Sequence, residues 1–208
     1  MSVIKIKINK EQELVWVQIL YLFIIPILLL YFNVLPDSLH IPMLFTITLL
    51  MYGIVKYEKW SSLDLGIFKH FLKDITPYLI FTIVGVGFLF WLSKISTHNP
   101  LLDWWNNYKF LALFIPISVT QEIVFRGVLM KMLRNVFTNP AFIIILNASL
   151  FALMHVIFSN ATFILPLTFI AGIGFAWIYY RYPNLILISI SHCILNFIAM
   201  IFGFFVIK

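Results

Sequence analysis

The sequence places two charged residues, Glu122 and Arg126, inside an otherwise apolar stretch that runs from Phe110 to Leu133. Glu122 is the only acidic residue between Asp103 and the C-terminus. A charge at the centre of a membrane span costs about 2.5–3.5 kcal/mol on insertion scales, so such a residue usually belongs to a functional site. The two residues are four positions apart and therefore share one face of a helix. The pair predicts either a reactive site within a membrane or an ion pair that ties helices together.

Two later apolar stretches repeat this spacing of four. Phe151 is followed by His155, and His192 is followed by Asn196. Counted at 1.5 Å per residue along their helices, the carboxylate, both imidazoles and the amide all lie about 12–22 Å from the same membrane face. The agreement in depth predicts that these side chains meet in one layer near the middle of the membrane.

Together these groups provide the means to activate a water molecule against a carbonyl carbon. Glu122 can accept a proton as a general base. The imidazoles of His155 and His192 can accept a proton, donate a hydrogen bond or bind a metal. The amide of Asn196 can donate to a developing oxyanion. If a divalent metal such as zinc takes part, its expected ligands are Glu122 and the two histidines; no other cofactor is expected.

The composition predicts an all-α integral membrane protein. Of 208 residues, 62% are hydrophobic and 11% charged, with a mean hydropathy of +1.03, whereas a soluble domain is about half apolar and a quarter charged. Long apolar runs without alternation indicate helices rather than a barrel. The net charge of +6 comes mainly from lysines clustered on one side of the membrane, so nucleic-acid binding is not expected. The lone cysteine, Cys193, excludes an intrachain disulfide and a thiolate metal cluster.

The apolar stretches predict a polytopic helical bundle of about seven spans, with residues 1–208 in a single membrane domain. Loops on the N-terminal side contain ten lysines and arginines and the opposite loops three, so the N-terminus is predicted to be cytoplasmic. A polar, amphipathic connector, Lys56–Asp74, is expected to lie along the membrane surface. The expected spans are Val15–Leu35, Ile41–Val55, Ile75–Leu92, Phe110–Leu133, Ala141–Phe158, Thr162–Tyr180 and Leu185–Ile207.

Three short segments resemble the motifs of the CAAX protease and bacteriocin-processing family, also called CPBP or Abi. Gln121–Gly127, with the sequence QEIVFRG, resembles a first motif in which two glutamates are followed, after three residues, by arginine. Phe151–His155 resembles Phe-x-x-x-His, and His192–Asn196 resembles His-x-x-x-Asn. All three occur in order, each in an expected span, within roughly Phe110 to Phe204. The expected division of the chain is 1–107 for the N-terminal spans and connector and 108–206 for the CAAX-protease-like catalytic core.

The resemblance implies membrane-embedded endoproteolysis, including removal of the last three residues of prenylated proteins. The implied substrate is a membrane-embedded or lipidated peptide or protein, and bacterial members are linked to peptide maturation in the cell membrane. The implied roles assign water activation to the pair Gln121-Glu122 with His155, the oxyanion to His192 and Asn196, and orientation of the acidic pair to Arg126. Members have been called metalloproteases, but the same residues fit a metal-free glutamate protease. The cleft is expected between the fourth, fifth and seventh spans, open to the cytoplasm or sideways to lipid.

One position departs from the family pattern. Gln121 stands where a glutamate usually serves as the base, and an amide accepts no proton at neutral pH. Glu122 could serve as the base if the helix is rotated slightly, or the glutamine is a substitution that traps substrate. Alternatively, the chain is a catalytically impaired relative that binds a partner in the same cleft, as a membrane scaffold or bacteriocin-immunity protein. A coupled transporter is a weaker alternative because the sequence contains no inverted repeat.

Overall fold

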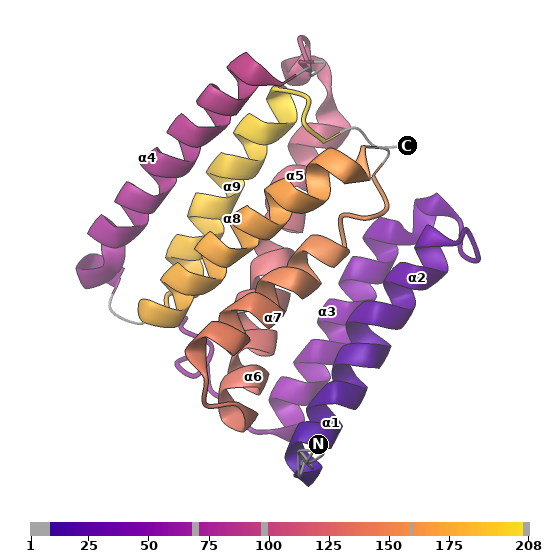
Figure 1. Ribbon diagram of the computed structural model, residues 1–208, viewed down its shortest axis with the longest axis vertical. Helices are drawn as coiled ribbons and strands as arrows, with labels where there is room; N and C mark the ends of the chain where they lie inside the picture. The colour runs from indigo at the N-terminus through magenta and orange to yellow at the C-terminus, as the bar shows by residue number, and fades with distance from the viewer. Residues whose placement is uncertain (1–8, 68–70, 97–99, 159, 206–208) are drawn as a thin grey trace, which may run out of the picture.

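The computed structural model describes residues 9–67, 71–96, 100–158 and 160–205, and within them all regular structure is helical (Figure 1). This confirms the predicted all-α bundle. Seven helical segments correspond to the seven expected spans in this part of the chain, and five of them are long and apolar enough to cross a membrane. The five are Lys10–Tyr31, His40–Tyr57, Lys73–Ile95, Tyr108–Val136 and Ala161–Arg181.

The expected fifth and seventh spans are shorter helices than the apolar runs suggested. The fifth helix ends at Leu153 and the seventh at Ile201. After Leu153 the chain turns, with the backbone N–H of His155 donating to the carbonyl of Ala152 at 2.9 Å. Hydropathy extends through such a turn because its residues are as apolar as the helix before it, so it did not reveal where the helix stops.

The first two spans form a hairpin along one side of the bundle (Figure 1). Asn9 begins the first helix, and its side-chain oxygen accepts hydrogen bonds from the backbone N–H groups of Glu11 and Gln12. A π-helical turn precedes Pro26, which has no N–H group to continue the α-helical pattern. The elements of the hairpin are α1 (Lys10–Ile19), the π-helical η1 (Leu20–Ile24), α2 (Ile25–Tyr31), the short η2 (Asp37–Leu39) and α3 (His40–Tyr57).

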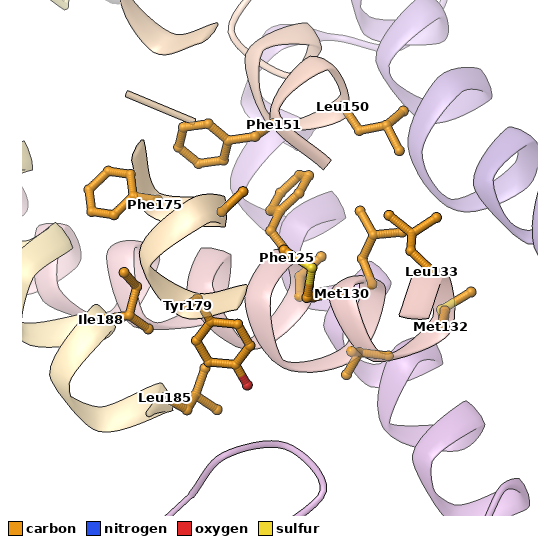
Figure 2. Packing of buried hydrophobic residues seen from close by; sticks show 14 of the residues in the cluster. Phe125, Met130, Met132, Leu133, Leu150, Phe151, Phe175, Tyr179, Leu185 and Ile188 are labelled. Atoms are coloured by element: carbon orange, nitrogen blue, oxygen red, sulfur yellow. The ribbon is translucent and has the colours of Figure 1, made fainter. Parts of the chain in front are cut away.

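The remaining elements form the rest of the bundle. They are α4 (Phe71–Ile95), the short η3 (Trp104–Asn106), α5 (Tyr108–Glu122), the π-helical η4 (Ile123–Leu129), α6 (Met130–Val136), α7 (Pro140–Leu153), α8 (Ala161–Arg181) and α9 (Leu185–Ile201). The fourth span comprises α5, η4 and α6. Of its most apolar stretch, 61% is buried inside the protein, against 11–39% in the other four spans. Phe125, Met130 and Leu133 from this span belong to one buried cluster with Phe151 of α7 and Phe175 of α8 (Figure 2). The fourth span is therefore the central helix of the bundle.

Helix packing places α7 and α9 against this centre. α7 packs along α8, and α9 contacts both α4 and α5. α7 and α8 approach closely at Gly172, where an added Cβ would lie 3.2 Å from the Cα of Ala148. Asparagine side chains cap the starts of α7 and α9, with Asn139 accepting from the backbone N–H groups of Ala141 and Phe142 and Asn184 from that of Leu187. These caps set where the two helices begin.

The connector after α3 does more than lie on the membrane surface. The hydroxyl of Tyr179 donates to the carbonyl of Leu65 at 2.8 Å, and the backbone N–H of Leu185 donates to the carbonyl of Gly66 at 3.0 Å. The connector thus closes one end of the bundle, where α6 ends and α9 begins. We call this the basic end, and its cationic side chains include Lys56, Lys59, Lys131, Arg134 and Arg181. Residues 68–70 of the expected connector lie outside the described part of the chain.

The tight docking of the connector depends on glycine at position 66. Gly66 has φ +69°, and an added Cβ would lie 2.9 Å from the carbonyl oxygen of Pro183. We expect Gly66→Ala to lower the free energy of unfolding by about 1–3 kcal/mol, because a left-handed backbone disfavours a side chain and the docked backbone cannot retreat. Thermal unfolding in detergent measures the change. Gly53→Ala is the control, since nothing lies within 4 Å of its added Cβ; equal melting temperatures of the two variants would contradict the docking.

Candidate active site

The carboxylate of Glu122 is the centre of a buried polar cluster. Its Oε1 accepts a hydrogen bond from Nη1 of Arg126 at 3.2 Å and lies 2.6 Å from Nδ1 of His192. Glu122 and Arg126 are both 0% exposed, and His192 is buried beside them. The four-residue spacing on one helix therefore forms the ion pair that it predicted, and α9 supplies the third member. We call Glu122, Arg126 and His192 the buried triad.

Aromatic rings and a backbone carbonyl enclose the guanidinium of Arg126. Its Nη2 donates to the carbonyl of Gly172 at 3.3 Å. Its carbon lies 4.3 Å from the ring centre of Phe151 and 5.2 Å from that of Phe175. A desolvated cation over an aromatic face gains about 2 kcal/mol, which offsets part of the cost of burying the charge. α5 and η4 are thereby tied to α7 and α8.

The ring of His192 is held by the same surroundings. Its centre lies 4.9 Å from that of Phe175 and 5.7 Å from that of Phe151. When Nδ1 carries the proton that is donated to Glu122, the neutral ring has its lone pair on Nε2. This contact joins α9 to the end of α5, which are 70 residues apart in the chain.

Three other predicted site residues line a cavity of about 310 Å³. They are Gln121 at the end of α5, His155 in the turn after α7 and Asn196 on α9. Glu122 and His192 are absent from the lining of this cavity. Neighbouring residues on a helix point about 100° apart, so Gln121 faces the cavity while Glu122 faces the core. The helix is not rotated to bring Glu122 to this wall.

The contacts of His155 define its hydrogen-bonding state. Its Nδ1 lies 2.9 Å from the carbonyl of Phe151, which accepts only if this nitrogen carries the proton. In the neutral ring Nε2 is then a free acceptor. Phe158 stacks on the imidazole with 5.7 Å between ring centres, and Phe205 lies 5.9 Å away. The ring is thus oriented by one hydrogen bond and two aromatic contacts.

Asn196 is oriented by a residue on the facing helix. Its Nδ2 donates to Oγ of Ser118 at 2.8 Å, and that hydroxyl donates to the carbonyl of Phe114 at 2.7 Å. One of the two amide hydrogens of Asn196 remains for another acceptor. Ser118 lies one turn before Glu122 on α5, so α5 holds α9 at two successive levels.

The first two spans contribute much of the cavity, although the cleft was expected between the fourth, fifth and seventh spans alone. Most hairpin residues in its lining are apolar, and Ser38 and His40 add two polar side chains. The hairpin reaches the cavity because α3 lies beside the fourth span. The cavity lies in the half of the bundle away from the basic end, where α2 ends and α3 begins. The hairpin residues that line it include Leu22, Phe23, Ile27, Leu30, Ile41, Met43, Leu44 and Ile47.

The sequence interpretation missed two polar residues that support the site. Ser118 orients Asn196, and Asn147 on α7 donates to the carbonyl of Phe125 in η4 at 2.7 Å. Asn147 is fully buried. It is a lone amide in the middle of an apolar run, the same signal that singled out Glu122. Phe175 could not be found, because one phenylalanine among 22 carries no distinguishing mark.

The suggested metal ligands do not fit a zinc centre. Oε1 of Glu122 already contacts Arg126 and His192, and the guanidinium supplies the positive charge that a cation would bring. Within the residues that the structure describes, no group of three or more His, Cys, Asp or Glu side chains is placed to hold a metal ion. A catalytic zinc site usually has three protein ligands. No step of the reaction proposed below uses a metal.

The buried triad predicts a strong coupling between its charges. We expect Glu122→Leu to lower the free energy of unfolding by about 3–5 kcal/mol, because it leaves the cation of Arg126 buried without its anion. The double variant Glu122→Leu/Arg126→Met is expected to recover part of that loss, since it removes both charges. Chemical unfolding in detergent compares them, with the exposed Glu58→Ala as the control. A single variant as stable as the control would contradict the coupling.

Comparison with known proteins relates part of the chain to one family. Searches of curated proteins and of solved structures found no match. Residues 103–198 match a model of the family described as type II CAAX prenyl endopeptidase Rce1-like. The match covers just under half of the chain and includes the three motif segments and the buried triad, whereas the hairpin lies outside it. Residues 103–198 are thus similar to the CAAX prenyl endopeptidase family.

Proposed function

We propose that the chain is an intramembrane endopeptidase that hydrolyses a peptide bond in membrane-embedded or lipidated peptides and proteins. The observation that carries the proposal is the placement of His155 and Asn196, with Gln121, on the lining of a mostly apolar cavity within the helical bundle. The match of residues 103–198 to the CAAX prenyl endopeptidase family model supports the reaction class. The hairpin lines the cavity mainly with apolar side chains, apart from Ser38 and His40, which supports an apolar substrate segment or lipid chain as the occupant.

His155 is the proposed general base. Its Nε2 takes a proton from water while the water oxygen forms a bond to the scissile carbonyl carbon. The hydrogen bond from Nδ1 to the carbonyl of Phe151 favours the tautomer that leaves Nε2 unprotonated. As the bond from carbon to nitrogen breaks, Nε2 returns the proton to the leaving amine. The proton taken from water thus ends on the amine product, and the electron pair of the broken bond stays on the amine nitrogen.

Asn196 and Gln121 are the proposed donors to the oxyanion. The second amide hydrogen of Asn196 is available because the first is donated to Ser118. The amide of Gln121 lines the same cavity and offers two further N–H groups. Donors that are already oriented stabilise developing charge without reorganising during the reaction, and removing one such donor typically costs about 10²–10³ in rate.

The buried triad positions these groups and does not touch the substrate in this proposal. His192 lies one turn before Asn196 on α9, so its contact with Glu122 sets the height of Asn196 relative to Gln121. Arg126 joins the end of α5 to the carbonyl of Gly172 and to Phe151, whose own carbonyl holds His155. Each member of the triad is thus linked to a residue of the cavity wall.

A binding protein is the second candidate function. No aspartate or glutamate lines the cavity within the part of the chain that the structure describes, and Gln121 occupies the wall position where the family pattern has a glutamate. A cavity lined by two amides, two imidazoles and a hydroxyl can hold an extended peptide without cleaving it. In this case the chain is a scaffold or immunity protein that binds a membrane-embedded partner.

Substitution of His155 tests its role as the base. We expect His155→Asn to lower the rate of cleavage of lipidated peptides in detergent by at least about 100-fold, because the asparagine amide can still donate to the carbonyl of Phe151 but offers no basic nitrogen. Peptide products are quantified by mass spectrometry. Ser149→Ala on α7, the helix that precedes His155, is the control and should cleave at the parent rate. Parent-like cleavage by His155→Asn would exclude His155 as the base.

Substitution of Gln121, the position that departs from the family pattern, provides a further test. We expect Gln121→Glu to raise the cleavage rate by about 100-fold, because a carboxylate at this wall position adds a second base beside His155. Gln121→Leu, which removes the amide donors, should lower the rate. The same peptide panel is used for all variants.

Together the outcomes separate the two candidate functions. Absence of cleavage in the parent and in Gln121→Glu, on every peptide of the panel, would remove the endopeptidase proposal. A partner that copurifies from membranes in equal amounts with the parent and with His155→Asn would then identify a binding role.

A further inference from the structure

A second pocket lies at the basic end of the bundle and shares no lining residue with the active-site cavity. Its volume is about 290 Å³. Three segments enclose it: the connector through Asp64, the fourth span from Gly127 to Asn135, and the end of α8 at Tyr179. Unlike the cavity, it brings charged side chains together, since Lys131 and Arg134 both line it. Nothing in the proposed reaction uses it.

The cations of this pocket are held in place. Nζ of Lys131 lies 3.2 Å from Oδ1 of Asp64 and 5.9 Å from the ring centre of Trp60. The guanidinium carbon of Arg134 lies 4.6 Å from the ring centre of Tyr180. An ammonium has three N–H donors, so the bond to Asp64 leaves two for a ligand. Two cations and one carboxylate leave the pocket with one excess positive charge.

Asp64 keeps its negative charge at physiological pH. Hydrogen bonds from the side chain and the backbone of Ser61, with a third from Lys131, lower the pKa of Asp64 to about 2. The carboxylate therefore competes with any anionic ligand for Lys131. An incoming anion must either use the remaining donors of Lys131 and Arg134 or displace Asp64.

We propose that this pocket binds the phosphate of an anionic phospholipid headgroup. Lysine and arginine together are the usual partners of phosphate oxygens, and basic pockets between membrane helices bind anionic headgroups. The position supports a lipid as the source of the phosphate: the pocket lies where the membrane-crossing helices Tyr108–Val136 and Ala161–Arg181 end, and Trp60 and Tyr180 flank its cations. Aromatic side chains at such an end mark the depth of the headgroups.

Binding of phosphatidylglycerol to the detergent-solubilised chain tests the proposal, measured as dissociation constants by native mass spectrometry. We expect the parent to bind phosphatidylglycerol at least tenfold more tightly than phosphatidylcholine with the same acyl chains. Lys131→Gln/Arg134→Gln should weaken phosphatidylglycerol binding about 25-fold, at about fivefold for each charge near an anionic headgroup. Lys56→Gln/Arg181→Gln is the matched control, because it removes the same charge from the same end without touching the pocket. Its binding should equal that of the parent.

Asp64→Asn provides a test in the opposite direction. Removing the competing carboxylate should tighten phosphatidylglycerol binding about fivefold. This variant decides the question if the double variant fails to fold. Equal binding by the parent and Lys131→Gln/Arg134→Gln, or no gain with Asp64→Asn, would overturn the proposal. Saturable binding of inorganic phosphate without preference for phosphatidylglycerol would overturn the assignment to a lipid.

Discussion

The sharing of one buried carboxylate by two partners is the interaction on which the rest of the structure depends. Glu122 accepts from Arg126 on its own helix and pairs with His192 on α9, where no water is available to replace either contact. Burying ions costs several kcal/mol each, and only well-placed partners offset that cost. The rings of Phe151 and Phe175 complete the enclosure of the guanidinium. These contacts link the fourth span to α7, α8 and α9.

This arrangement assigns different work to two adjacent residues. Glu122 faces the core and forms the buried triad, whereas Gln121 faces the cavity and takes no part in the triad. A neutral side chain at position 122 would leave Arg126 without its anion, but one at position 121 disturbs no buried charge. The departure from the family pattern therefore falls at the position where the fold tolerates it. The fold thus sets no requirement for a carboxylate at this wall position.

Two parts of the chain line the cavity, one inside the family match and one outside it. Gln121, His155 and Asn196 come from residues 103–198, which match the family model, whereas the hairpin lies outside the match and supplies mostly apolar side chains with Ser38 and His40. The contacts between α3 and the fourth span bring these parts together. The three predicted site residues of the cavity thus belong to the matched part, while the hairpin shapes the space beside them.

The sequence by itself determined the all-helical membrane fold, the order of the helices and the residues of the polar layer. Hydropathy and a spacing of four suffice for this, because both are properties of one helix at a time. Only the tertiary structure decided which of those residues share a triad and which line a cavity, since the rotation of a helix about its axis is set by its neighbours. For the same reason Ser118, Asn147 and the hairpin wall became visible only when α5, α7 and α3 were packed together.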